Sequence, residues 1–188
     1  MNESNAPAPG TTEDLLVCVD SGDNVLGFKG KFECHTGHGI LHRAFSVFLF
    51  NARNEVLLQQ RAPGKRLWPG FWSNACCSHP RKDERLETAV ERRLVEELGV
   101  QTAVRYLFTF EYHARYLDQG SEHELCSVLA GRYEQLPVAN PDEISGLQFV
   151  APGELDALIA AHPERYSPWL KLEWAQLRAA HWHTIVAL

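Results

Sequence analysis

The chain has 188 residues, of which 45% are hydrophobic, and a formal net charge of −6 at pH 7. Length and composition favour a single domain with one sizeable core, and interspersed charges without a basic run argue against a nucleic-acid partner. No apolar stretch approaches the roughly 20 residues that span a bilayer, and the start of the chain lacks the features of a signal peptide. We therefore expect a cytoplasmic protein with no membrane partner, in which residues 1–12 form a disordered tail and residues 13–188 one domain.

The first half of this domain is predicted to be sheet. Segments 15–19 and 25–31 flank a Ser-Gly-Asp-Asn turn and are typical of a β-hairpin. Segments 43–50 and 55–61 are rich in aromatic and branched residues, which indicates a second pair of strands. A further short strand is expected over residues 71–78.

The second half adds helices to the sheet. A helix is predicted from about residue 83 to residue 98, and Gly99 is suited to end it. Residues 100–114 and 122–133 indicate a long hairpin. The remaining predicted elements are a strand at 147–150 and helices at 152–161 and 167–182. Mixed strands with a central helix and C-terminal helices predict an α/β (α+β) sandwich, because the connections are too short for repeated βαβ crossovers.

The central helix departs from a simple amphipathic pattern. At 100° per residue, Arg93 and Glu97 fall inside the apolar stripe that must face the core. Because burial of an unpaired carboxylate costs several kcal/mol, Glu97 needs a cation and Arg93 needs an anion. The two residues could pair with each other as an i,i+4 ion pair. Alternatively, Glu97 holds a divalent metal ion and Arg93 a phosphate. The apolar stripe consists of Leu86, Ala89, Val90, Leu94 and Leu98.

Histidines and carboxylates beside the predicted strands could form a metal site. Glu122 and Glu124 are two residues apart on one strand, so their side chains project to the same face. Together with His35, His42 and His79 they would offer three imidazoles and two carboxylates to Mn²⁺, Mg²⁺ or Zn²⁺. The mixture of nitrogen and oxygen donors favours Mn²⁺ or Zn²⁺ over Mg²⁺.

A rival set of ligands would combine His38 with His35 and His42 on one helical face. Gly37 and Gly39 argue against a helix at this place in the chain. We expect the other histidines to be surface residues or to be satisfied by ordinary hydrogen bonds. These are His113, His123, His162, His181 and His183.

Residues 79–100 resemble the Nudix box, a metal-binding motif built around a helix. The residues that match its pattern are Glu84, Arg92, Leu94, Glu96, Glu97, Gly99 and Val100. Two positions depart from it, because Ser78 stands where the box begins with glycine and Arg93 stands where it has glutamate. Nudix hydrolases use clustered carboxylates to bind the metal ions that activate water, so the change to arginine weakens that chemistry.

Four further segments are together similar to the type 1 isopentenyl-diphosphate isomerase family. They are HTGHGILHRAFSVFLF (35–50), QQRAPGKRLWPGFWSNACCSHP (59–80), EHELC (122–126) and YSPW (166–169). The second is the most specific, since it combines a Trp-Pro-Gly turn, a thiol and a histidine. The resemblance covers about residues 31–169 and implies a Nudix-type mixed β-sheet sandwich with a central Nudix helix and C-terminal helices. It also implies an enzyme that interconverts isopentenyl diphosphate and dimethylallyl diphosphate by metal-dependent proton transfer to and from the alkene.

The resemblance further implies roles for individual residues. His35, His42, His79, Glu122 and Glu124 would ligate one metal ion. Glu97 would hold a second ion, Mg²⁺, that arrives with the isoprenoid diphosphate substrate. The contacts to the diphosphate would be made by Lys31, Arg61, Lys65 and Arg93. Guanidinium forks and ammonium charges suit such an anion.

For the proton transfers the resemblance implies Cys77 as the catalytic thiol. Glu124 with Tyr112 would deliver a proton to the terminal alkene carbon and the Cys77 thiolate would remove the allylic one, although the reverse direction stays open. Trp169 would set its π face against the cationic centre formed on protonation. Trp68, Phe71 and Trp72 either help to close a dry pocket or pack in the core, which is the more common place for aromatic residues.

The five cysteines form an odd set without CxxC spacing, so free thiols are expected rather than disulfides or a zinc knuckle. On a strand through residues 71–78, Cys77 and His79 would project to one face and Cys76 and Ser78 to the other. Cys77 would then share the side of the metal ligands. Cys76 would pack as a small core residue.

Two other functions compete with the isomerase. One is a Nudix pyrophosphohydrolase acting on a diphosphate-containing substrate, and Arg93 and Ser78 count against it. The other is a catalytically silent binding module, which the complete set of predicted catalytic side chains disfavours. The sequence is compatible with a monomer or a weak homodimer.

Overall fold

A mixed sheet of nine strands lies at the centre of residues 14–188, the part of the chain that the computed structural model describes. The strands are β1 (Leu15–Val19), β2 (Val25–Gly30), β3 (His42–Phe50), β4 (Val56–Arg61), β5 (Trp72–Asn74), β6 (Cys76–Ser78), β7 (Val104–Tyr116), β8 (Gly120–Arg132) and β9 (Ile144–Val150). The helices are α1 (Lys31–Cys34), α2 (Leu86–Leu98), α3 (Pro152–Ala161), α4 (Pro168–Gln176) and α5 (Trp182–Val186). The tail predicted over residues 1–12 lies outside the described residues.

Strand β3 is the centre of the sheet. It runs parallel to β8 over its whole length, from the pair His42 and Glu124 to the pair Phe50 and Arg132. On its other edge β3 pairs with the short strand β6, where Ser46 stands opposite Cys77. This topology brings chain segments that are far apart in sequence into register beside one another.

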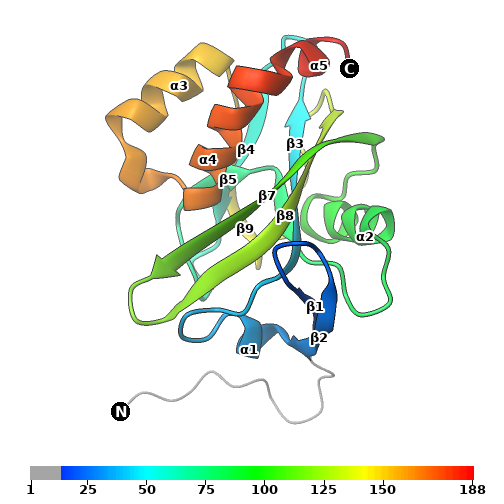
Figure 1. Cartoon of the computed structure of the whole chain (residues 1–188). Helices are drawn as coiled ribbons and strands as arrows, with labels where there is room; N and C mark the ends of the chain where they lie inside the picture. Colours follow the sequence, from blue (N-terminus) through cyan, green and yellow to red (C-terminus); the bar gives the residue numbers. More distant parts are fainter. Residues whose placement is uncertain (1–13) are drawn as a thin grey trace.

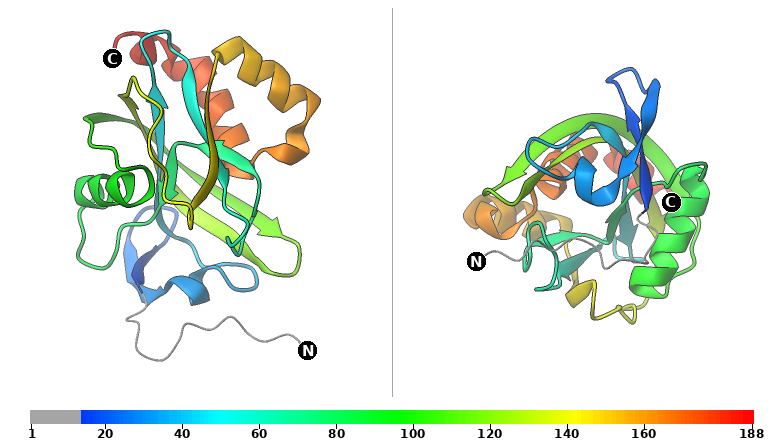
Figure 2. Two further views of the ribbon diagram at one scale, coloured as in Figure 1. Left: turned by 180° about the vertical axis from the view of Figure 1, so that it is seen from behind. Right: turned by 90° about the horizontal axis from the view of Figure 1, so that it is seen from below.

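Two apolar cores lie on opposite sides of the sheet, with α2 on one side and α3 to α5 on the other (Figure 1). The view from behind shows the same separation (Figure 2). Side chains of β3 alternate between the two cores: Phe45 and Leu49 pack with Leu94 of α2, whereas Phe48 packs with Leu170 of α4. Both faces of β3 are therefore buried, which explains its nearly continuous run of apolar residues.

Helix α2 follows the predicted pattern except at its start. Ala89, Val90 and Leu94 are fully buried, as the stripe requires, and Gly99 ends the helix with a left-handed φ of 63°. The predicted start near residue 83 is wrong by three residues. Asp83 has a φ of 64°, which no residue of a right-handed helix adopts.

The predicted pairing of segments 43–50 and 55–61 is largely wrong. Strands β3 and β4 share only the pair Phe50 and Val56, because β8 and β6 occupy the edges of β3. Strand β4 pairs instead with β5 and β9.

The single strand expected over residues 71–78 is divided into β5 and β6. The chain leaves the edge of β4 and joins the edge of β3 at Ala75. The Asn74 amide donates to the carbonyls of Val47 and Cys76, both at 3.2 Å, and so satisfies the backbone at the crossing.

The remaining elements agree with expectation apart from their ends. The long hairpin is present as β7 and β8, and α3 has the predicted bounds. Strand β2 ends at Gly30, one residue before Lys31 begins α1. The helix predicted over 167–182 consists of α4, a π-helical segment Leu177–His181, and α5. Within residues 14–188, no helix is long and apolar enough to cross a membrane.

Candidate active site

Five buried side chains converge where β3 and β8 begin to run side by side. Ligand atoms of His35, His42, His79, Glu122 and Glu124 all lie within 4.8 Å of one another. His35 Nε2 is 2.8 Å from Glu122 Oε2, and His79 Nε2 is 2.8 Å from Glu124 Oε1. We call these five residues the His/Glu cluster. It contains the whole ligand set predicted from the sequence, and the rival His38 lies outside it, exposed to solvent.

Sheet register explains why the cluster forms. His42 and Glu124 are direct partners in the parallel ladder of β3 and β8, and Glu122 lies two residues before Glu124 on the same face. His79 follows β6, which is hydrogen-bonded to the other edge of β3. His35 ends α1, and its carbonyl accepts a hydrogen bond from Ser121 N at 3.1 Å.

The imidazoles are oriented by backbone carbonyls. His35 Nδ1 lies 2.6 Å from the carbonyl of Lys31, and His42 Nδ1 lies 2.6 Å from that of Ile40. These contacts place the proton on Nδ1 and leave the Nε2 lone pair free to bind a metal ion. His42 Nε2 is buried and, within residues 14–188, has no hydrogen-bond partner. A bound divalent ion would accept this lone pair and so give His42 Nε2 a partner.

The charge of the cluster also fits a divalent cation. Burial and then the charge of His35 lower the pKa of His42 to about 4, and burial holds the pKa of His79 well below its ordinary value. Both imidazoles are therefore neutral, which is the form that binds metals. Burial and the adjacent Glu122 carboxylate raise the pKa of Glu124 well above its ordinary value. Burial lowers the pKa of His35, but the charge of Glu122 and its hydrogen bond to the ring raise it above the ordinary value. One cationic imidazole therefore faces two buried carboxyl groups, and the donor set of the cluster suits a divalent metal ion.

Tyr112 connects this cluster to a group of packed aromatic side chains, Trp68, Trp169 and Tyr112 itself, which we call the aromatic chamber. Its hydroxyl donates to Glu124 Oε2 at 2.7 Å, and its ring packs in a cluster with Trp68 and Trp169. Trp169 meets Trp68 edge to face, with ring centroids 5.3 Å apart. Phe71 also contacts this chamber, as predicted. Trp72 does not, because its side chain packs in the core beneath the C-terminal helices.

Cys77 lies at the same chamber and is held by polar neighbours. Its thiol donates to Asn74 Oδ1 at 2.9 Å, and Trp169 Nε1 lies 3.2 Å from its sulfur. Burial raises the pKa of the Cys77 thiol well above its ordinary value, with the Glu173 carboxylate as the next largest cause. Cys76 faces away and is fully buried in the core beneath α2. The two neighbouring cysteines thus face opposite sides, as the strand alternation predicted, and all five cysteines are free thiols.

The four cationic residues predicted to contact a diphosphate lie close enough for their charges to interact. They are Lys31, Arg61, Lys65 and Arg93. Arg61 donates to the carbonyls of Leu67 at 2.8 Å and Trp68 at 3.1 Å, and its guanidinium lies 5.3 Å from the centre of the Trp169 ring. Burial, reinforced by Arg61, Lys31 and Arg93 and opposed by Glu97, lowers the pKa of Lys65 to about 8. The four cations therefore lie near one another, and Arg61 lies against the aromatic ring of Trp169.

Carboxylates balance these cations in a second acidic cluster. Glu97 is 2% exposed and forms an ion pair with Arg93, so the i,i+4 pair considered from the sequence is present. Glu143 contacts Arg93 Nη2 at 3.2 Å and also pairs with Lys65. We call Glu97, Glu143, Arg93 and Lys65 the ion-pair cluster. Sequence reasoning missed Glu143, which stands in an ordinary polar loop before β9.

Gly120 is another site residue that the sequence did not reveal. It begins β8 with a φ of 153°, and a Cβ at this position would lie 2.1 Å from the carbonyl oxygen of His35. The backbone of the hairpin can approach His35 this closely only because residue 120 has no side chain. The sequence explained this glycine by the predicted hairpin turn alone, so its close approach to His35 was not predicted.

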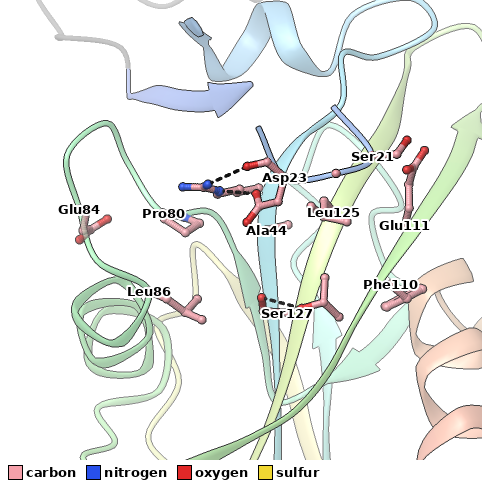
Figure 3. A pocket seen from close by; sticks show the side chains of 13 residues that line it. Ser21, Asp23, Ala44, Pro80, Glu84, Leu86, Phe110, Glu111, Leu125 and Ser127 are labelled. Atoms are coloured by element: carbon pink, nitrogen blue, oxygen red, sulfur yellow. Dashed lines mark hydrogen bonds and ion pairs between the residues drawn. The ribbon is translucent and has the colours of Figure 1, made fainter. Parts of the chain in front are cut away.

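A separate hollow lies on the opposite side of β8 (Figure 3). Leu125 and Ser127 line it, and they alternate along the strand with Glu124 and Cys126, which face the site described above. Its one arginine, Arg43, is occupied by an ion pair with Asp23, Nε to Oδ1, at 2.6 Å. None of the predicted catalytic, binding or metal-ligating residues lines this hollow.

Comparisons with known proteins agree with this architecture. The NUDIX domain family matches residues 40–172. Isopentenyl-diphosphate Delta-isomerase 1 of Photorhabdus laumondii is 44% identical over 168 residues, 88% of this chain and 96% of that protein. Isopentenyl-diphosphate Delta-isomerase 2 of Aromatoleum aromaticum is 42% identical over 158 residues, 84% of this chain and 83% of that protein. The crystal structure of DR0079 from Deinococcus radiodurans matches with a TM-score of 0.66 and 26% identity, over 79% of this chain and 90% of that chain. The predicted Nudix-type mixed sandwich is confirmed.

Proposed function

The chain belongs to the isopentenyl-diphosphate Delta-isomerase family of NUDIX-domain proteins, and on that premise we propose that it interconverts isopentenyl diphosphate and dimethylallyl diphosphate in isoprenoid biosynthesis. One observation supports this assignment most strongly. Cys77 and the hydrogen-bonded pair Tyr112 and Glu124 border the same aromatic chamber, so a small alkene between them would have a proton-handling group on each face.

Movement of the double bond requires one proton to be added and another to be removed. We assign delivery to Glu124 with Tyr112, because these two side chains are hydrogen-bonded to each other and Tyr112 packs against Trp169. In such a relay the Tyr112 hydroxyl would give its own proton to the terminal alkene carbon and take a proton from the Glu124 carboxyl in exchange. Removal of the allylic proton is assigned to the Cys77 thiolate. The reverse reaction exchanges these two roles.

Protonation of an unactivated alkene produces a centre with the character of a tertiary carbocation, which water would trap. The packed rings of Trp68, Trp169 and Tyr112 exclude water from the chamber. The Trp169 indole is held in place because its Nε1 donates to Ser73 Oγ at 2.8 Å. A π face fixed beside a desolvated cation contributes about 2 kcal/mol or more.

We propose that the His/Glu cluster holds a divalent ion, Mn²⁺, Zn²⁺ or Mg²⁺. Three oriented imidazoles and two carboxylates support this assignment, as does the unpartnered His42 Nε2. A divalent ion bound there would fix the Glu124 carboxylate and tune its basicity. A second ion, Mg²⁺ carried by the substrate, is assigned to Glu97 in the ion-pair cluster.

The substrate diphosphate is assigned to Lys31, Arg61, Lys65 and Arg93. Lys65 and Arg93 are neutralised by Glu143 in the ion-pair cluster, and a diphosphate would offer them stronger anionic partners. The anchored diphosphate would then direct the five-carbon chain toward Trp169 and Cys77. Cytoplasmic localisation and a monomeric or weakly dimeric state remain predictions of the sequence.

Product analysis tests the proposed function. Metal-loaded protein is incubated with isopentenyl diphosphate, and the products are followed by proton and phosphorus NMR. We expect dimethylallyl diphosphate without release of phosphate. Released phosphate would instead support the pyrophosphohydrolase, and unchanged substrate with Mg²⁺, Mn²⁺ and Zn²⁺ would contradict both activities.

The two adjacent cysteines provide a matched pair of variants for the same assay. Cys77→Ala is expected to abolish turnover while metal content and folding are retained. Cys76→Ala removes a sulfur from the core beneath α2 and is expected to keep turnover within a few-fold of wild type. Equal losses in two folded variants would overturn the assignment of Cys77.

A further inference from the structure

One arginine bridges three segments that carry different parts of the candidate site. Arg66 belongs to the loop between β4 and β5. Its Nη2 donates to the carbonyl of Gln119, in the turn between β7 and β8, at 2.8 Å. The same nitrogen lies 3.3 Å from Thr36 Oγ1, just after α1, and Nη1 lies 3.4 Å from the carbonyl of Phe32 within α1. One guanidinium therefore contacts a helix and a hairpin turn from its own loop.

The guanidinium of Arg66 is suited to contacts of this kind. Its carbon lies 4.2 Å from the centre of the Phe32 ring, which is within the range of a cation–π interaction. A planar guanidinium stacks on a ring and donates to several acceptors at once, whereas an ammonium group lacks the planar face. Within residues 14–188, no aspartate or glutamate forms an ion pair with Arg66. Its contacts are thus directed at neighbouring chain segments and not at one counter-charge.

The loop that carries Arg66 also carries groups assigned to the substrate. Lys65 precedes Arg66 and belongs to the ion-pair cluster. Trp68, two residues after Arg66, is part of the aromatic chamber and has a left-handed φ of 47°. A bulky residue in this conformation is strained, and it persists only where the surrounding structure holds it. Contacts that fix the loop therefore act on a cation assigned to the diphosphate and on the wall of the chamber.

The other two segments carry ligands of the His/Glu cluster. His35 directly follows α1, and Glu122 follows the β7–β8 turn closely. These segments are joined where Ser121 N donates to the His35 carbonyl at 3.1 Å. Gly120 lies at the same place, and a Cβ on it would be 3.3 Å from Arg66 Nη2. The guanidinium therefore lies where the end of the helix meets the start of β8.

We propose that Arg66 is a positioning residue that fastens the substrate-binding loop to the two segments carrying metal ligands, and so supports both substrate capture and metal binding. This inference rests on the proposed function. Arg66 acts through its neighbours, because the groups assigned to substrate and metal are Lys65 and Trp68 on one side and His35 and Glu122 on the other. Removal of this one side chain should therefore weaken both affinities.

The first test needs no turnover. Calorimetric titration of metal-free protein with Mn²⁺ measures binding at the His/Glu cluster. Arg66→Gln is expected to raise the Kd for Mn²⁺ about tenfold, as for other losses of support behind a ligand. Hydrogen exchange followed by mass spectrometry should be about threefold faster in peptides covering residues 31–37 and 117–122, and unchanged in β9. Arg53→Gln removes an exposed arginine from the turn between β3 and β4 and should leave both readouts at wild-type values.

The second test uses steady-state kinetics at saturating metal concentration. Arg66→Gln should raise KM for isopentenyl diphosphate about tenfold with little change in kcat, the pattern of lost substrate binding. Arg66→Lys keeps the charge without the planar fork, so its KM should stay about threefold above that of the wild type. Lys65→Gln, on the same loop, should raise KM without changing the Kd for Mn²⁺. An increase in both constants distinguishes a fastening residue from a simple substrate contact.

The outcomes separate this inference from the proposed function. Absence of turnover in the wild type overturns the proposed function and the link to substrate capture, whereas the calorimetry and the exchange experiment still decide whether Arg66 fastens the three segments. An unchanged Kd for Mn²⁺ or unchanged exchange in folded Arg66→Gln overturns the role of Arg66, as does a wild-type KM in Arg66→Lys. If Arg66→Gln does not fold, Phe32→Leu removes the ring beneath the guanidinium and decides the question by the same readouts.

Discussion

Two acidic clusters lie close to each other in this structure, and they differ in how far cationic side chains neutralise their carboxylates. In the His/Glu cluster, no lysine or arginine of residues 14–188 forms an ion pair with Glu122 or Glu124, and two of the histidines are held neutral. The third, His35, pairs with Glu122, which raises its pKa against the effect of burial. In the ion-pair cluster, Glu97 and Glu143 are matched by Arg93 and Lys65. The first cluster therefore has fewer cationic side chains than carboxyl groups, whereas in the second the two numbers match.

Under the proposed function, this difference would distinguish a resident metal site from a site that binds the substrate diphosphate. A buried carboxylate without a counter-charge destabilises the fold by several kcal/mol unless a cation is supplied. Ion pairs that are already made release their cations only to a stronger anion, such as a diphosphate with its own Mg²⁺. The following changes should therefore affect the two clusters unequally.

Metal removal should have the largest effect and should act through the His/Glu cluster. Chelation is expected to abolish turnover and to lower Tm by roughly 5–10 °C, because a bound ion adds several kcal/mol to the stability of the native state. Differential scanning calorimetry of the stripped and reloaded protein measures the change. A Tm that does not respond to chelator would contradict the assignment of a resident ion to this cluster.

Glu124→Gln should come next, since Glu124 is both a cluster member and the proposed proton donor. We expect kcat to fall about 10³-fold, within the range for loss of a general acid or base. Steady-state kinetics at saturating metal measures the loss. Glu111→Gln, on the neighbouring strand and on the side of the separate hollow, is the matched control and should stay near wild type. A loss below tenfold in Glu124→Gln would remove it from the proposed chemistry.

Gly120→Ala should weaken the His/Glu cluster without touching a ligand. The new Cβ would collide with the His35 carbonyl and displace the histidine that the carbonyl belongs to. Metal affinity is expected to drop about 10-fold to 100-fold, as for other losses of support behind a ligand. Isothermal titration calorimetry checks this prediction. Gly64→Ala, where a Cβ meets nothing within 4 Å, is the control, and equal affinities in the two variants would contradict it.

Glu97→Gln should perturb the ion-pair cluster more than the His/Glu cluster. Loss of one buried carboxylate leaves Arg93 short of counter-charge, which costs about 3 kcal/mol of folding free energy. It should also raise KM for isopentenyl diphosphate about tenfold through weaker Mg²⁺ binding. Glu96→Gln removes the exposed partner of Arg93 and should cost under about 1 kcal/mol. Urea unfolding and metal analysis test both, and loss of the resident ion in Glu97→Gln would show that the clusters are not independent.

The smallest effect concerns pH and Lys65. Its pKa is lowered from 10.5 to about 8, so its positive charge is present below pH 8 and is lost as pH rises through that value. For substrate capture, kcat/KM should therefore decline a few-fold above pH 8. Lys65→Arg keeps the charge at all these pH values and should lack the decline. A pH profile of kcat/KM for the two proteins decides the point.

Local pattern was sufficient to predict much of the fold. The side of α2 that faces the core depends on residues within a few turns of one another. The periodicity of 100° per residue therefore correctly placed Arg93 and Glu97 toward the interior. Pairing of β3 with β8 could not be predicted in this way, because it joins distant segments and its register depends on the assembled core. The incorrect pairing of segments 43–50 and 55–61 has the same cause.

The same distinction between local pattern and long-range contact applies to the residues of the candidate site. His35, His42, His79 and the two glutamates were predicted because the resemblance supplied the identity of residues that spacing alone left ambiguous. Asn74 and Glu143 were missed because each makes its contact with the site only through a neighbour on another element.

Reaction in D₂O tests the central claim most directly, namely that Glu124 with Tyr112 and the Cys77 thiolate exchange protons with opposite faces of one alkene. Metal-loaded protein is mixed with isopentenyl diphosphate in D₂O, and the position of deuterium in the product is read by NMR. We predict dimethylallyl diphosphate that carries deuterium in a methyl group, and no exchange in Cys77→Ala. Product formed without deuterium from solvent, or equal turnover in Cys77→Ala, would contradict this account.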